Sequence, residues 1–305
     1  MQRIAHPVIT ANYPENAKGG IMVCGINFGV SKNEELAIAN GEHVAKEIPS
    51  FFSDQNVRKS DRFNRKIVDW LSSWGLPLTR TKGQETAFDK CFFQTNWVDS
   101  QTENADLEGR NEILINNAAG ILSLIEDRRP SIILFFGRGL IEALSDTQSV
   151  DSLDGKSVRD VAESILGLRS GNAKRHEAMR ADGTKAKNHL LLQKFGETQI
   201  ICFPHPTGSY GVSDDDMRIL KPPIYVWDRF QEKINLNLKF TYPTDDYPEH
   251  IHTSNENDVS TGSDDPLFDE VKSFFADSKP SVSDIQLKWR LGYSRALAIK
   301  EALFS

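Results

Sequence analysis

The sequence contains little cysteine and no long apolar run. Its three cysteines, Cys24, Cys91 and Cys202, are far apart and lie inside predicted strands. This is typical of reduced core thiols rather than of a disulfide framework, and three thiols are too few for an iron–sulfur cluster with four ligands. No stretch reaches the length of a membrane span, and residues 1–20 contain no hydrophobic signal region. We therefore expect a cytosolic protein without membrane contact.

Several signatures of enzyme classes are missing as well. The chain has no Walker phosphate loop, no zinc-spaced cysteine set and no Gly-x-Ser-x-Gly elbow, so we expect neither a metal nor a cofactor. A surplus of positive charge is also missing, because 43 Asp and Glu outweigh 36 Lys and Arg and the net charge is −7. Phosphate contacts need Lys and Arg, yet the distribution of charge matters more than the total, so DNA is neither indicated nor excluded.

The charges are unevenly distributed along the chain. Acidic residues are dense in residues 241–265, whereas residues 169–194 are rich in bases. That basic segment could approach a DNA backbone, although a solvated, variable insertion is the plainer interpretation. Its members are Arg169, Lys174, Arg175, Arg180, Lys185, Lys187 and Lys194.

Four short apolar runs predict the core of the fold. They cover residues 21–24, 91–95, 131–136 and 199–203 and stop at Gly, Pro or Asn, which is typical of buried parallel strands. Amphipathic helices are expected between them, at 61–74 and through 113–125, and residues 141–195 are expected to be polar and helical. Alternating strands and helices predict an α/β fold, a three-layer αβα sandwich with a central parallel four-stranded sheet, over residues 1–238.

Polar residues follow three of these strands. Gly25-Ile26-Asn27 ends the first, Asn96 ends the second, and His205-Pro206-Thr207-Gly208 follows the last. Ligands of open α/β sheets bind beyond the carboxyl ends of the strands, so we expect Asn27, Asn96 and His205 to face one site. Two amides and an imidazole predict a hydrogen-bonding pocket rather than a phosphate cradle.

At these residues, over about residues 15–235, the chain resembles the uracil-DNA glycosylase superfamily. Gly25-Ile26-Asn27 is similar to the water-activating first motif of its mismatch-specific and single-strand-selective branches, and His205-Pro206-Thr207-Gly208 to its His-Pro-Ser second motif. The resemblance implies that Asn27 holds the attacking water, that His205 donates to the pyrimidine O2, and that Asn96 reads the base edge. Asn27 as a simple turn cap is the structural alternative.

Further residues are candidates for contact with a flipped base or with the DNA. Phe51 or Phe52 could stack on a flipped base, with core packing as the alternative. Tyr210, next to Ser209, is a candidate wedge that fills the vacated stack. Phe28 stands where the resembled branches have Pro or a small residue, and Thr207-Gly208 replaces Ser-Pro. These departures leave a modified pyrimidine open as the substrate.

The C-terminal part has a different composition. Residues 239–264 are acidic and poor in large apolar residues, which predicts a flexible linker. Residues 265–305 have three helical segments and a Gly-containing turn, the arrangement of a helix-turn-helix. Residues 285–296 resemble the DNA-reading gamma domain of the FtsK/SpoIIIE DNA translocases, but Ser294 replaces the usual Asn and the β-wing of a winged helix is missing. The candidate DNA contacts are Lys288, Arg290, Tyr293, Ser294, Arg295 and Lys300.

Two functions follow from these observations. The first is a monofunctional DNA glycosylase that hydrolyses the N-glycosidic bond of a flipped uracil or modified pyrimidine, in repair or foreign-DNA processing, with a helix-turn-helix that helps to hold the DNA. The second is a catalytically inactive DNA- or protein-binding factor that reuses the same fold. DNA is the expected partner of a monomeric chain, and protein docking through the C-terminal helices is the alternative.

Overall fold

A computed structural model describes residues 6–26, 49–58, 61–98, 110–206, 212–235, 268–275, 285, 299–300 and 302–303. The chain divides into two compact units, Met1–Pro243 and Thr244–Ser305. The predicted linker, 239–264, lies outside the described residues, so its boundaries stay a prediction. We describe each unit by itself.

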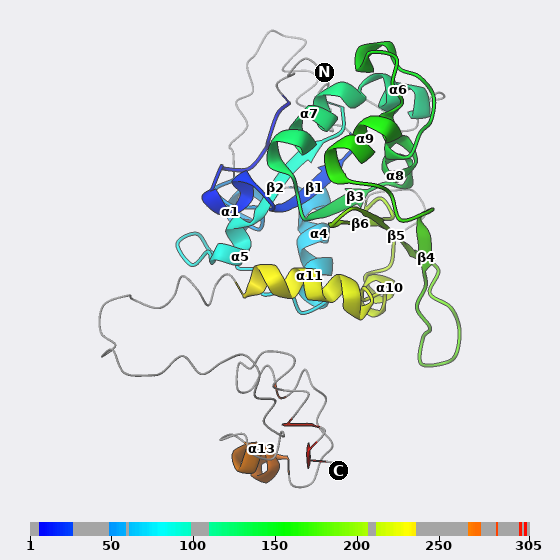
Figure 1. The fold of residues 1–305 in the computed structure, drawn as a ribbon. Coiled ribbons are helices and arrows are strands. Elements are labelled where there is room, and N and C mark those ends of the chain that lie inside the picture. Colours follow the sequence, from blue (N-terminus) through cyan, green and yellow to red (C-terminus); the bar gives the residue numbers. More distant parts are fainter. Residues whose placement is uncertain are drawn as a thin grey trace, which may run out of the picture. The chain divides into compact units, whose positions relative to one another are not determined.

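The first unit is built on a six-stranded mixed sheet with the strand order β2-β1-β3-β6-β5-β4 (Figure 1). β2, β1, β3 and β6 are parallel to one another, and β5 and β4 complete the sheet in antiparallel pairs. The strands are β1 Ile21–Gly25, β2 Phe92–Asn96, β3 Ile132–Phe136, β4 Lys174–His176, β5 Leu190–Phe195 and β6 Thr198–Phe203. The α/β class is therefore confirmed.

The prediction of a four-stranded, purely parallel sheet was wrong. The four parallel strands lie where they were expected, but β4 and β5 fall within residues 141–195, which were expected to be helical. A two-residue connection, Gly196-Glu197, joins β5 to β6 as a hairpin, with Gly196 at φ +49°. A positive φ at the first turn residue is what tight hairpins require. The same region does contain two helices, α8 Arg138–Leu144 and α9 Val158–Leu166.

Helices cover both faces of the sheet, so the unit has three layers (Figure 1). Successive strand residues point to opposite faces: Met22 and Cys24 pack with one helical layer, and Ile21 and Val23 with the other. The first layer contains α6 Arg110–Asn116, α7 Ala118–Arg128, α8 and α9; the second contains α4 Arg62–Ser73, α5 Ala87–Lys90, α10 Asp214–Ile219 and α11 Ile224–Ile234. Short helices α1 Pro14–Ala17, α3 Gln55–Arg58 and 3-10 helix η1 Asp151–Leu153 complete the order.

Local sequence explains where the main helices begin and end. Asp61 and Ser157 cap α4 and α9 by accepting a hydrogen bond from the backbone N–H three residues on. The single helix expected through residues 113–125 is divided at Asn117 into α6 and α7. The C-cap of α7 is Arg129, which is in the left-handed region (φ 44°) directly before Pro130. A left-handed cap ends a helix, and the proline after it cannot continue one.

The three cysteines are free and buried, as predicted for reduced core thiols. Burial raises the pKa of the Cys24 thiol well above its usual value, and raises the pKa of Cys91 to about 11 and of Cys202 to about 12. Thiols with such pKa values carry almost no thiolate at neutral pH, so they are chemically quiet.

The second unit contains α13, Phe268–Phe274, and a small apolar core. Val271, Ile285 and Ile299 are fully buried, and Phe268, Phe275 and Leu303 pack against them. Of the predicted DNA contacts here, only Lys300 is described, and it is half-exposed. Lys288, Arg290, Tyr293, Ser294 and Arg295 lie outside the described residues, and their roles stay predictions.

Candidate site at the carboxyl ends of the parallel strands

Gly25 and Asn96 form the first part of the candidate site. They are register partners at the ends of β1 and β2, and a Cβ built on Gly25 would lie only 2.5 Å from Asn96 Oδ1. The Asn96 side chain therefore crosses directly over the Gly25 backbone. No other residue at position 25 leaves room for the amide in this place, which gives the glycine of the first motif a steric role.

The Asn96 amide has unused hydrogen-bonding capacity. Asn96 is only 5% exposed, yet within the described part of the chain its side-chain amide has no hydrogen-bond partner. The nearby buried amide of Gln94 differs, because its Nε2 donates to Asn64 Oδ1 at 2.7 Å, and Asn64 in turn donates to Asp61. The atoms of the Asn96 amide are not among the fully enclosed, unpaired polar atoms of the described residues, so the amide keeps some contact with solvent and its hydrogen-bonding capacity is open to a ligand.

Residues 6–12 hold the outer side of β2. The backbone N–H of Ile9 donates to the Gln94 carbonyl at 2.7 Å, and Thr95 Oγ1 donates to the Pro7 carbonyl at 2.7 Å. His6 Nε2 lies 2.6 Å from the Asn96 carbonyl oxygen. Asn96 is thus fixed by β1 on one side and by the N-terminal segment on the other.

Phe63 joins this pair to the histidine of the second motif. Its Cζ lies 3.5 Å from the Cβ position of Gly25, and its ring centroid lies 5.4 Å from that of His205, with a tilt of 46°. The Phe63 ring also makes an edge contact with the ring of Phe136, with the two centroids 5.9 Å apart. Phe63 falls within the helix predicted at 61–74 and was not among the predicted site residues. It lies in the first turn of α4, where it is half-buried while Ile67, Trp70 and Leu71 are buried, and no pattern in the sequence singles it out.

His205 lies two residues beyond β6, between Pro204 and Pro206, and is half-buried. β1 and β3 separate β2 from β6, so three interstrand spacings of about 4.8 Å place the two backbones roughly 14 Å apart. Asn96 and His205 are therefore not in contact. Of the predicted site residues, Gly25 and Asn96 lie against each other, and His205 lies farther along the same edge, beside Phe63.

The remaining predicted residues lie elsewhere or are not described. Phe51 and Phe52 are 1% and 0% exposed, and Phe52 stacks on Phe92 with ring centroids 5.4 Å apart. Both occupy core positions, so Phe63 is the better placed aromatic for a ligand ring. Asn27, Phe28, Thr207, Ser209 and Tyr210 lie outside the described residues, and their roles stay predictions.

A basic arm, residues 174–189, begins at the same edge of the sheet. Leu191 of β5 pairs with Cys202 of β6 in antiparallel register, so the start of β5 is level with the end of β6, where His205 follows. The arm is itself a hairpin: Ala186 N–H donates to the Ala178 carbonyl at 2.8 Å, and Arg180 N–H to the Thr184 carbonyl at 2.7 Å. Its turn contains Gly183 at φ +81°.

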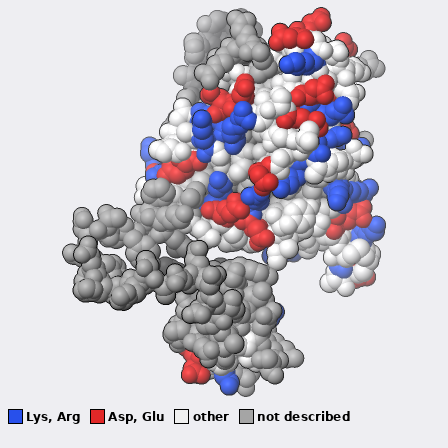
Figure 2. Space-filling view, in the orientation of Figure 1, with Lys and Arg blue, Asp and Glu red and all other residues white. Residues whose placement is uncertain are grey.

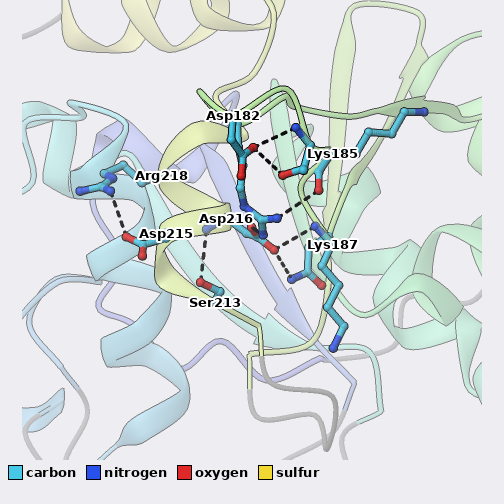
Figure 3. Close-up of polar contacts among 10 residues, drawn as sticks. Asp182, Lys185, Lys187, Ser213, Asp215, Asp216 and Arg218 are labelled. Carbon is cyan, nitrogen blue, oxygen red and sulfur yellow. Dashed lines mark hydrogen bonds and ion pairs between the residues drawn. The ribbon is translucent and has the colours of Figure 1, made fainter.

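The buried carboxylate of Asp216 fastens the arm to α10 (Figure 3). Asp216 is 1% exposed and accepts hydrogen bonds from the Arg180 guanidinium, from Lys187 N–H at 3.1 Å and from Asn188 Nδ2 at 3.2 Å. Its own N–H lies in the first turn of α10, near the Ser213 cap. A second tie joins His176 Nε2 to the Lys221 carbonyl at 2.8 Å. The arm therefore has a fixed position relative to α10.

Charges of both signs are interspersed on the face that Figure 2 shows, which fits the modest net charge. Near the arm, partial burial and then the positive charge of Arg175 lower the pKa of His189 below its usual 6.5; Glu177 opposes this shift and Arg138 adds to it. Arg138 begins α8 immediately after β3 and Gly137. The strand-end edge thus has the cations Arg175 and Arg138 beside a histidine whose pKa lies below its usual value.

No protein-family model matches the sequence, and no curated protein matches it either. Among the described residues, no group of three or more His, Cys, Asp or Glu side chains could hold a metal ion. No helix in the described ranges is long and apolar enough to cross a membrane.

Proposed function

We propose that the first unit is a DNA glycosylase of the uracil-DNA glycosylase superfamily that hydrolyses the N-glycosidic bond of a flipped uracil or modified pyrimidine. The observation that carries the proposal is the position of Asn96: a nearly buried amide, without a partner among the described residues, at the strand-end edge that also bears His205. An amide offers one donor group and one acceptor. With its oxygen toward N3–H and its nitrogen toward O4 it pairs with a uracil-type pyrimidine, and in that same orientation it opposes the donor and acceptor of cytosine. Discrimination therefore requires that the site hold the Asn96 amide in this one orientation.

Each residue has a distinct part in the proposed reaction. The bond between C1′ and the base breaks, the sugar develops positive charge, and the departing pyrimidine takes the electron pair as an anion. A His205 N–H directed at O2 stabilises that anion, because fixed donors act where charge develops. The half-buried Phe63 ring offers a flat face for the flipped base. Asn27, the residue after Ile26, would hold the water whose oxygen bonds to C1′, and the proton that this water loses neutralises the departed pyrimidine anion, directly or through solvent.

The proposal also predicts slow chemistry. Neither amide is a strong general base, so the rate depends on stabilising the leaving base more than on activating water. Replacing the His205 donor should therefore affect the chemical step, whereas replacing Asn96 should affect the choice of base and its binding. In the second unit we propose a helix-turn-helix that holds DNA; the small core of Val271, Ile285 and Ile299 is compatible with such a module.

The test is base release from labelled oligonucleotides that contain uracil, mismatched thymine or modified pyrimidines, in single and double strands. Abasic sites are cleaved with alkali and counted. We expect release by the full chain, a loss of roughly 10²-fold or more in His205→Ala as for other oxyanion-type donors, and a loss in Asn96→Ala. Asn12→Ala, which removes an exposed amide bonded to Arg128, is the matched control and should retain activity. No release from any substrate, with DNA binding retained, would assign the chain to non-catalytic binding factors.

A further inference from the structure

We infer that the basic arm, residues 174–189, is a binding surface for the phosphate backbone of a nucleic acid. The arm has five Lys or Arg, namely Lys174, Arg175, Arg180, Lys185 and Lys187, against the two acids Glu177 and Asp182, a surplus of three positive charges. The whole chain, by contrast, has a net charge of −7. The arm is therefore positive within an acidic protein.

The cations of the arm are accessible. Lys174, Arg175, Lys185 and Lys187 are all exposed, and the Lys185 and Lys187 side chains extend away from Asp216 (Figure 3). Glu177 pairs with Arg175 at 2.6 Å and with Lys185 at 2.7 Å, but exposed ion pairs contribute little free energy. A phosphate can therefore take the place of Glu177 at small cost.

The geometry favours a linear polyanion over a compact anion. Lys174 and Arg175 lie on β4, and Lys185 and Lys187 lie on the returning strand of the same hairpin. Arg175 and Lys185 meet at Glu177, whereas Lys174 and Lys187 lie at other positions of the hairpin, so the cations as a set are spread along an extended element. Since Asp216 and the His176 bond fix the arm, little conformational entropy is lost when a backbone binds along it.

The position of the arm links it to the candidate site. The arm joins β5 at the level where β6 ends, so it lies at the edge that carries His205. Arg138, at the start of α8, adds a cation at this edge. A nucleic acid that presents a base at the strand ends would have its backbone beside the arm. This last step rests on the proposed glycosylase function; the charge and accessibility of the arm do not.

The experiment measures binding of the full chain to a fluorescent 20-nucleotide duplex and single strand at several salt concentrations. The arm variant is Lys174→Gln, Lys185→Gln and Lys187→Gln together. The matched control is Lys18→Gln, Lys194→Gln and Lys233→Gln, which removes equal charge at the opposite edge, where Lys18 precedes β1, Lys194 pairs with Gln199 and Lys233 Nζ lies near Gly19. A third variant replaces the three arm lysines with Arg.

We expect the arm variant to weaken binding at least tenfold near 0.15 M salt. The slope of log K against log salt should fall by up to about three, because each lost phosphate contact removes about one. In the control variant, the loss of affinity and the change of the salt slope should each be at most about a third of those in the arm variant. The variant with Arg in place of the three arm lysines should bind like the parent. Equal loss in arm variant and control, or equal binding to polyglutamate and DNA, would overturn the inference.

Base release is scored separately, so the two proposals fail independently. If the parent chain releases no base but the arm variant loses DNA binding, the binding role of the arm is supported and the glycosylase activity is rejected. If the parent chain releases base, and the arm variant shows unchanged DNA binding and unchanged base release when DNA is limiting, only the binding role of the arm is rejected. Circular dichroism and the urea midpoint of each variant show whether it is folded.

Discussion

Replacing Gly25 with alanine tests the packing on which the site depends. The new methyl group would lie 2.5 Å from Asn96 Oδ1, while Phe63 Cζ, at 3.5 Å, is in ordinary contact. Gly25 does not have a positive φ, so the backbone tolerates alanine. Without a clash, the substitution would stabilise the protein by about 0.4–1 kcal/mol by restricting the unfolded chain. Overpacking costs about 1–3 kcal/mol, so the two effects together give a net loss of up to about 2.6 kcal/mol, centred at about 1.3 kcal/mol.

The clash should depend on the Asn96 side chain. In an Asn96→Ala background the obstructing oxygen is gone, so Gly25→Ala should be neutral or stabilising there, and the double-mutant cycle should give a coupling free energy of about 1–3 kcal/mol. Urea unfolding followed by circular dichroism measures each corner of the cycle. Base release measured on the same variants should fall in both single mutants, because each displaces or removes the amide.

Gly20→Ala is the matched control for this cycle. A Cβ there would lie 2.6 Å from the Cys91 carbonyl oxygen, which is backbone and cannot move aside easily. Its cost should therefore be the same with and without Asn96. If Gly25→Ala stabilises the parent, or costs as much in the Asn96→Ala background, then the amide does not lie over Gly25 and the argument for the site is refuted.

Three further predictions concern the rest of the first unit. Asp216→Ala should lower the free energy of unfolding by about 2–3 kcal/mol, because Lys187 N–H and Asn188 lose their acceptor, whereas the Arg180 side chain, which is 40% exposed, can be solvated by water. Trypsin should then cleave faster at Arg180, Lys185 and Lys187. An unchanged cleavage rate would contradict the anchoring of the arm by Asp216. The three thiols should resist a disulfide reagent at pH 8 in the folded protein and react fully in urea, since the pKa of Cys91 is about 11 and that of Cys202 about 12; fast labelling of the native chain would show that they are accessible. By NMR, the His189 ring should titrate below pH 6.5, and its pKa should rise in Arg175→Gln; a fall of that pKa would show that the arginine is not close to the ring. Since folding lowers the pKa of His189, its contribution to stability is present above pH 6.5 and is lost as the pH falls below that value.

The sequence predicted most of the parallel sheet because buried parallel strands are short, apolar and punctuated by Gly, Pro or Asn. The run Ile132–Phe136 is an example, since all five of its residues are buried. β5 was missed because Gln193 and Lys194 interrupt its apolar residues, and β4, Lys174–His176, contains no apolar residue at all. A three-residue edge strand acquires its structure from pairing, which local sequence does not record.

The candidate site was predicted in part for a similar reason. Asn96 and His205 were found because they follow strands, and strand ends meet at one edge of a parallel sheet. Phe63 was not found, because its closeness to Gly25 and His205 depends on the way α4 packs across the sheet. Phe51 and Phe52 were candidates from residue type alone, and burial separates them from Phe63. Long-range packing, rather than local pattern, selects which aromatic ring reaches the site.

The N-terminal segment has a consequence for how the chain is handled. β2 lies at one end of the sheet order, and its outer hydrogen-bonding groups are taken up by the Ile9 amide and the Thr10 hydroxyl. A chain shortened past Thr10 would expose an unpaired edge strand, which is a template for pairing with a second molecule. Such a truncation should self-associate in a concentration-dependent way, and the added strand would cover the carbonyl of Asn96 that His6 now contacts.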